Sequence, residues 1–150
     1  MPNIFNPDFK DFLKILSKNK VDYILVGGYA VILHGYIRST GDMDLWVEKN
    51  SSNYEKLKLS YHDFGAPIFG EDEFLSETVD VWSIGREPNK IEILTHLTGL
   101  EFDNCVENCE FFTDDELIIP YIFIDDLLIN KMATGRYKDL NDVEQLNKKK

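Results

Sequence analysis

The stretch that decides the fold is Leu25-Val26-Gly27-Gly28, which thirteen residues separate from Asp42-Met43-Asp44-Leu45. Residues 21–26, before the glycine pair, are rich in β-branched and aromatic side chains, which favour a short strand. Residues 29–34 then indicate a compact helix that ends at Gly35. The first stretch therefore predicts a strand, a glycine turn and a helix in direct succession.

The second stretch predicts a strand that carries paired carboxylates. Side chains alternate over residues 42–48, so Asp42, Asp44 and Trp46 share one face of the strand. We expect Trp46 to fill or border the core, and stacking on a base is the alternative. Glu92 lies on a further apolar strand. If the strands are neighbours, mutual repulsion among three carboxylates is tolerable only with a divalent cation between them. The alternative is that these acids simply face solvent on the surface of the sheet and bind no metal.

The glycine pair and a nearby arginine suit the binding of phosphate. A Gly-Gly turn allows the backbone to approach an anion closely, and the N-terminus of the following helix directs N–H groups and a positive dipole end toward it. Arg38, four residues before Asp42, adds a cation. Magnesium, or manganese, bridges protein carboxylates to substrate phosphates, so the pattern predicts a metal-dependent phosphate site.

The rest of the chain is consistent with one α+β domain over residues 1–150, with a central mixed sheet flanked by helices and a C-terminal helical tail over about 125–150. No internal repeat or linker composition divides it. The other expected elements are helices over 7–18, 53–64, 100–108, 125–134 and 138–149, strands over 79–84, 90–94, 111–119 and 121–124, and a loop over 70–77.

Charge limits the possible partners. The chain has 27 acidic and 16 basic residues and a formal net charge of -11, with a sequence pI near 4.6. Binding to long nucleic acids is disfavoured, because neutralising phosphates requires clustered Lys and Arg. The same field repels free nucleotides, so local cations or metal ions must reverse it at any phosphate site.

Cys105 and Cys109 are the chain's two cysteines. We expect reduced thiols in a cytoplasmic protein, since a disulfide scaffold needs more cysteines in a shorter chain and no signal peptide is evident. No apolar run approaches the roughly 18 residues of a membrane span, so we expect no membrane insertion.

The two stretches carry a resemblance to a known family. Leu25–Gly28 with Asp42–Leu45 resembles the glycine-pair and Asp-x-Asp signature of the nucleotidyltransferase fold that includes DNA polymerase β. The longer stretch 26–48 looks like the small bacterial nucleotidyltransferase-like proteins. Some members of that wider group are toxin or antitoxin components or antibiotic-modifying enzymes. Residues 91–94 are placed like the strand that bears the family's third carboxylate, and residues 124–146 are similar to its helical tail.

The resemblance implies specific roles for residues of this chain. Asp42 and Asp44 would be metal ligands, and Glu92 would be the third ligand or the base that activates the incoming hydroxyl. The residues that would contact the nucleotide are Gly27, Gly28, Arg38, Thr40, Lys131 and Arg136. For Lys131 and Arg136 a plain role as cations at a helix end is an equal alternative.

Three functions are compatible with the sequence. The first is an enzyme that moves a nucleoside monophosphate from a nucleoside triphosphate to a hydroxyl of a small molecule, a protein or an RNA end, with two-metal catalysis and a homodimer or protein partner completing the acceptor site. The second is a catalytically weak nucleotide- or metal-binding module that acts with a partner protein, as in toxin-antitoxin pairs. The third is a soluble domain whose acids only solubilise it. A separation of the three carboxylates beyond about 8 Å would exclude the first two.

Overall fold

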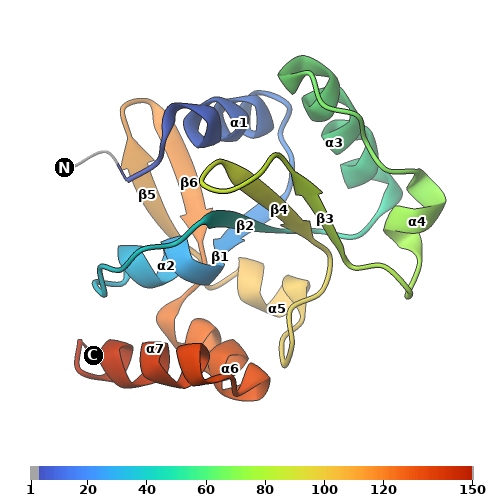
Figure 1. Ribbon diagram of the computed structural model, residues 1–150. Coiled ribbons are helices and arrows are strands. Elements are labelled where there is room, and N and C mark those ends of the chain that lie inside the picture. The colour runs from blue at the N-terminus through green and yellow to red at the C-terminus, as the bar shows by residue number, and fades with distance from the viewer. Residues whose placement is uncertain (1–3, 150) are drawn as a thin grey trace.

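A computed structural model describes residues 4–149 and shows a six-stranded mixed sheet with helices on both faces (Figure 1). The sheet order is β3-β4-β2-β1-β6-β5. The strands are β1 (Tyr23–Val26), β2 (Asp42–Val47), β3 (Val81–Ile84), β4 (Lys90–Leu94), β5 (Glu110–Asp114) and β6 (Leu117–Tyr121). The expected α+β class with a central mixed sheet is confirmed. Of the expected domain 1–150, residues 1–3 and 150 lie outside the described part.

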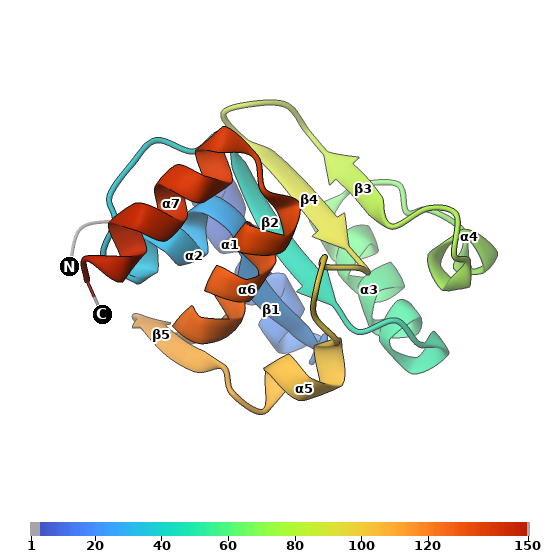
Figure 2. The same cartoon turned by 90° about the horizontal axis from the view of Figure 1, so that it is seen from below.

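Seven helices are described along the chain. They are α1 (Pro7–Lys18), α2 (Gly27–Leu33), α3 (Ser51–Phe64), α4 (Glu71–Leu75), α5 (Phe102–Val106), α6 (Ile124–Thr134) and α7 (Tyr137–Asn147). Helices α1 and α3 cover one face of the sheet, whereas α5, α6 and α7 lie on the opposite face (Figures 1 and 2). No helix in residues 4–149 is long and apolar enough to cross a membrane.

Each face of the sheet has its own apolar core. On the α1 and α3 face, Phe9, Phe12 and Leu57 pack against the inward side chains of β2 and β4. On the other face, Trp46 of β2 packs with Leu127, Leu128 and residues of α5. Because successive side chains of a strand point to opposite faces, the two cores together fix which residues of β2 face the tail helices.

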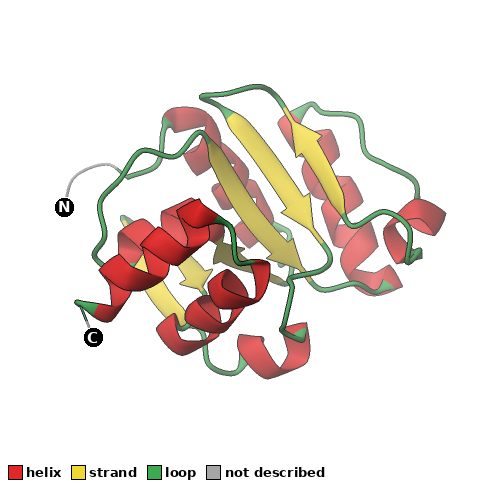
Figure 3. Cartoon of the chain, turned by 60° about the horizontal axis from the view of Figure 1, so that its bottom comes forward, coloured by secondary structure: helices red, strands yellow, loops and turns green. Residues whose placement is uncertain are grey.

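Strand register brings the acidic residues together. Strand β2 pairs antiparallel with β1 and parallel with β4, and its Cα partners on β4 include Asp42 with Lys90 and Asp44 with Glu92. The strands expected over 79–84 and 90–94 are present as β3 and β4, which are antiparallel neighbours. The parallel β2–β4 contact joins segments that α3, α4 and β3 separate in sequence. Figure 3 shows strands of the sheet side by side, with helices packed around them.

Three local expectations were wrong. The strand expected over 121–124 does not form, because β6 continues through Pro120 and ends at Tyr121, and α6 begins at Ile124. Residues 70–77 were expected to form a loop, but α4 lies there, because Phe74 is fully buried and packs on Phe69 and Trp82. The extended segment expected over 111–119 is interrupted, because Asp115 adopts a positive φ of 55° and turns the chain between β5 and β6.

Candidate active site

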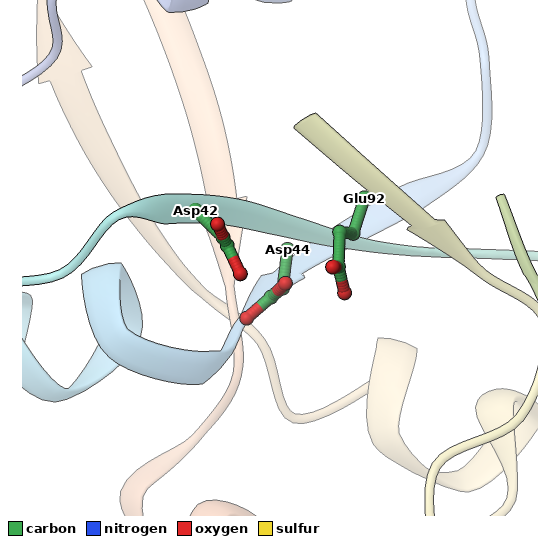
Figure 4. Close-up of side chains that lie close together, drawn as sticks. All are labelled: Asp42, Asp44 and Glu92. Carbon is green, nitrogen blue, oxygen red and sulfur yellow. The ribbon is translucent and has the colours of Figure 1, made fainter. Parts of the chain in front are cut away.

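Three carboxylates form the centre of the site. Asp42 and Asp44 descend from β2 and Glu92 from the neighbouring β4, all on one face of the sheet (Figure 4). One oxygen from each of the three side chains lies within 4.8 Å of the other two. All three residues are half-buried. The arrangement is far tighter than the 8 Å limit that would exclude a shared metal.

The environment of Asp44 makes its carboxyl group harder to ionise than an ordinary aspartate. Burial and then the charges of Glu92 and Asp42 raise the pKa of Asp44 to about 7, against a partial offset from Lys131 and Lys138. A pKa raised by both desolvation and like charges is typical of a carboxylate in a cluster whose negative charge is only partly offset.

The donor set fits a hard divalent cation. All three ligands offer oxygen, which Mg²⁺ and Mn²⁺ prefer. In addition, the Oδ1 atom of Asp42 is buried and has no hydrogen-bond partner among the described residues. A buried carboxylate oxygen without a partner is costly, and coordination of a cation would satisfy it.

Lys90 is a member of this cluster that the sequence analysis did not single out. Its Nζ lies 2.8 Å from Oε1 of Glu92 and 3.9 Å from Oδ2 of Asp42. The hydrogen bond to Glu92 raises the pKa of Lys90, which keeps the ammonium charged. The signal was present, since Lys90 and Glu92 are two residues apart on one strand and must share a face. A fixed cation therefore offsets part of the triad's charge.

The glycine pair makes room for two other site residues. Gly27 has a φ of +68°, and a Cβ at this position would overlap the carboxylate of Asp44. A Cβ at Gly28 would lie 2.5 Å from Oγ1 of Thr40. The sequence pattern predicts that these glycines allow close approach of a phosphate. The structure adds a second reason, which is that the first turn of α2 packs directly on the acidic strand.

Buried ion pairs fix Arg38 and Lys131. The guanidinium of Arg38 donates from Nε and Nη2 to the two carboxylate oxygens of Asp142, each at 2.9 Å. Nζ of Lys131 lies 3.1 Å from both Asp139 and Asp142. Both aspartates are fully buried. Two cations expected at the nucleotide are therefore held by acids of α7, whose burial the sequence analysis did not anticipate.

Arg136 joins the same network from the turn between α6 and α7. Its Nε donates to Oδ2 of Asp139 at 2.7 Å, and the hydroxyl of Thr134 donates to that oxygen at 2.6 Å. Burial alone would raise the pKa of Asp139, but hydrogen bonds from Arg136, Thr134 and Lys131 outweigh it and hold the pKa well below its ordinary value. Most of the Arg136 side chain stays exposed, which leaves it accessible to a ligand.

A single cleft of about 420 Å³, here called the triad cleft, is lined by every residue that the sequence analysis assigned to the site. Its lining includes Gly27, Gly28, Arg38, Thr40, Asp42, Asp44, Glu92, Lys131 and Arg136. The structure thus brings together segments from the glycine turn, the acidic strands and the helical tail. The catalytic and binding roles of these residues stay predictions.

Two aromatic or imidazole side chains near the site are structural. Trp46 is 1% exposed and its ring meets that of Phe102 edge-on, which places it in the core rather than on a base. A ring nitrogen of His34 lies 2.7 Å from the carbonyl oxygen of Ile122. The position of Trp46 agrees with the core role that was favoured for it, and the contact of His34 shows that its ring is held by the backbone.

The fold and the acidic cluster together define the nucleotidyltransferase class, and comparison with solved structures agrees. The crystal structure of the lincosamide antibiotic adenylyltransferase LnuA, bound to lincomycin, superposes with a TM-score of 0.65 at 18% identity, covering 99% of this chain and 100% of that one. A structure from Thermotoga maritima assigned as a nucleotidyltransferase gives a TM-score of 0.62 at 12% identity, covering 95% and 91%. At these identities the likeness shows a shared fold.

The chain belongs to the DUF6036 family, described as nucleotidyltransferase of unknown function, whose sequence model matches residues 8–147. A search of curated proteins gave no match. The resemblance expected from the glycine pair and the Asp-x-Asp strand is therefore confirmed at the level of family and fold.

Proposed function

We propose that this protein transfers a nucleoside monophosphate from a nucleoside triphosphate to a hydroxyl group. The observation that carries the proposal is the clustering of the Asp42, Asp44 and Glu92 carboxylates within 4.8 Å, in a cleft shared with the glycine pair and the cations of the tail. Membership of a nucleotidyltransferase family and the fold of an adenylyltransferase support it.

Asp42, Asp44 and Glu92 are the residues that would hold divalent ions. When bound, two Mg²⁺ or Mn²⁺ ions would offset the charge of the triphosphate and stabilise the attacking and leaving oxygens. Asp42 contributes an oxygen that is otherwise unsatisfied. Asp44 contributes a carboxylate whose pKa is raised, so a nearby cation would stabilise its charged form.

The reaction balances as a displacement at the α-phosphorus. The acceptor oxygen forms a bond to the α-phosphorus, the bond from that phosphorus to the bridging oxygen of the β-phosphate breaks, and pyrophosphate leaves with the electron pair. Glu92 accepts the hydroxyl proton as the general base. Lys90, at 2.8 Å from Glu92, offsets part of the charge of that carboxylate before the ligands arrive.

The residues around the triad suit a triphosphate. Val26 caps α2 without a side-chain hydrogen bond, so backbone N–H groups at the glycine turn remain for phosphate oxygens. Arg38, Lys131 and Arg136 bring positive charge to the cleft of an otherwise acidic protein, and Thr40 adds a hydroxyl. The net charge of -11 favours a small-molecule or protein acceptor over a long nucleic acid.

The test is transfer of label from each of four α-³²P-labelled nucleoside triphosphates, with Mg²⁺, in the presence and absence of cell lysate. We expect label on an acceptor with the wild-type chain and none with Asp42→Asn combined with Asp44→Asn. The exposed Asp11→Asn on α1 is the matched control and should retain transfer.

Two results would contradict the proposal. Equal labelling by the double variant would assign the activity to another protein. If no triphosphate is consumed while nucleotide or metal binding still depends on Asp42 and Asp44, the chain is instead a regulatory module that acts with a partner protein, as in a toxin-antitoxin pair.

A further inference from the structure

The triad cleft changes character along strand β4. Leu94 follows Glu92 by two residues on the same face of that strand, and its Cα partner on β3 is Val81. Both line the triad cleft, together with Leu97 from the segment after β4. Two residues of a strand span about 7 Å, so an apolar surface begins about that far from the triad. We call Val81, Leu94 and Leu97 the apolar end of the triad cleft.

The side-chain amide of Asn130 lies at this apolar end. Asn130 of α6 lines the triad cleft and is only 8% exposed. Its Nδ2 atom donates to the carbonyl oxygen of Thr98 at 3.0 Å, and Thr98 directly follows Leu97. A buried polar group therefore stands beside the apolar surface.

The hydrogen bond to Thr98 fixes which way round the amide lies. A carbonyl oxygen only accepts hydrogen bonds, so the amide nitrogen of Asn130 must face Thr98, and Oδ1 is left for another partner. Among residues 4–149 no donor reaches Oδ1 of Asn130, and this oxygen is not sealed from solvent. Acceptors on buried side chains usually have a donor, so the free oxygen indicates a ligand that donates a hydrogen bond.

The turn that holds the amide packs closely on α6. The backbone N–H of Leu100 donates to the carbonyl oxygen of Leu97 at 3.1 Å and closes the turn. Gly99 has a φ of +86°, and a Cβ at this position would lie 3.2 Å from the Cβ of Ala133. Because turn and helix are in contact, the carbonyl oxygen of Thr98 and the amide of Asn130 hold each other in place. An acceptor fixed in this way can discriminate between ligands.

We propose that the apolar end holds the nucleobase of the triphosphate and that Asn130 selects bases with an amino group at purine C6 or pyrimidine C4. The inference rests on the proposed nucleotidyl transfer. With the phosphates at the glycine turn and the α-phosphorus at the triad, the nucleoside continues beyond the triad. The apolar side chains would contact the ring, and Oδ1 of Asn130 would accept a hydrogen bond from the amino group.

The fixed orientation of the amide is the source of the selectivity. Adenine and cytosine present an amino donor at these positions, whereas hypoxanthine and uracil present a carbonyl oxygen. A carbonyl there would face Oδ1 of Asn130 oxygen to oxygen and leave both acceptors without a donor. A site built to bind one hydrogen-bonding group strongly rejects a ligand that lacks it.

The test compares two pairs of nucleotides that differ mainly at this one position. ATP is paired with inosine triphosphate, and CTP with UTP. Titration calorimetry on the full chain with Mg²⁺, and without an acceptor, measures binding alone. We expect the amino-bearing member of at least one pair to bind about tenfold or more tightly than its partner. Discrimination within either pair supports the inference.

One variant removes the acceptor, and a matched one controls for the substitution. Asn130→Leu should weaken ATP binding and bring ATP and inosine triphosphate within about threefold of each other. Asn147→Leu makes the same change at an exposed position of α7 and should leave the preference of the wild type intact. The comparison of nucleotides on the wild-type chain needs no variant, so it decides the question even if Asn130→Leu does not fold.

Equal binding within both pairs, or a preference for the carbonyl-bearing nucleotides, would overturn the inference and leave the proposed function intact, because triphosphates would still bind. A folded Asn130→Leu variant that keeps the full preference would overturn it as well, since another residue would then read the base. If none of the four triphosphates binds, the proposed function is contradicted and the inference falls with it.

Discussion

Arg38 and Asp142 lie 104 residues apart in sequence and form a two-bonded ion pair in which Nε and Nη2 of the arginine each donate at 2.9 Å. Asp142 is fully buried and the Arg38 side chain is only 13% exposed. The ion pair connects the segment before β2 to α7 in the helical tail. The helical tail is therefore part of the wall of the triad cleft.

The first prediction concerns this ion pair. Asp142→Asn leaves the planar Arg38 and the buried Lys131 without their common anion, and removal of one partner from a buried pair costs about 3 kcal/mol. We expect the free energy of unfolding in urea to fall by about that amount. Glu144→Gln, an exposed change on the same helix, should alter it by less than about 0.5 kcal/mol. Equal effects of the two substitutions would mean that the pair does not stabilise the tail.

The second prediction separates two roles of Gly27. Gly27 and Gly65 both have a positive φ, of +68° and +88°, but a Cβ at Gly27 meets the Asp44 carboxylate whereas a Cβ at Gly65 meets nothing within 4 Å. Alanine at either position strains the backbone by about 1 kcal/mol. Only Gly27→Ala should also displace Asp44, and we expect it to weaken Mn²⁺ binding, followed by electron paramagnetic resonance, at least tenfold. Similar Mn²⁺ affinities in the two variants would contradict the packing of α2 on Asp44.

Local patterns in the sequence account for most of the site. Side-chain alternation over 42–48 predicted the shared face of Asp42 and Asp44, and the apolar residues around Glu92 predicted its strand. A helix start at Pro7 and a stop at Gly65 were likewise local signals, and both were correct. Such features depend on periodicity and capping, which a short stretch of sequence contains.

What escaped prediction depends on contacts between distant segments. The shared face of Lys90 and Glu92 is a local signal, but Lys90 lies beside Asp42 only because β4 pairs in parallel with β2, and no local pattern fixes which strands become neighbours. Asp139 and Asp142 occupy the buried face of α7, where apolar residues are the usual occupants, because Arg38 and Lys131 reach them from elsewhere in the chain. The short helix α4 similarly forms because Phe74 is buried against Trp82.

The third prediction follows from the pKa of Asp44, which burial and the neighbouring acids raise to about 7. Unfolded aspartate titrates near pH 3.9, so between about pH 4 and pH 7 the metal-free folded protein binds a proton that the unfolded chain does not. This contribution to stability is lost as the pH rises through about 7. In EDTA, Asp44→Asn should exceed the wild type in free energy of unfolding by about 2 kcal/mol at pH 8, with a smaller difference at pH 5. A gap independent of pH would contradict the assignment.

The fourth prediction addresses Lys90, whose ammonium group lies 2.8 Å from Glu92 and 3.9 Å from Asp42. This tethered cation offsets the charge that would attract a divalent ion, and it occupies an oxygen of the third ligand. Lys90→Met should therefore tighten Mn²⁺ binding, by about tenfold if the gain is near 1.4 kcal/mol. Lys18→Met, a change of the same charge at an exposed position of α1, should leave the affinity unchanged. Weaker Mn²⁺ binding by Lys90→Met would instead show that Lys90 holds Glu92 in the geometry that the metal requires, because the loss of a competing cation alone can only strengthen the site.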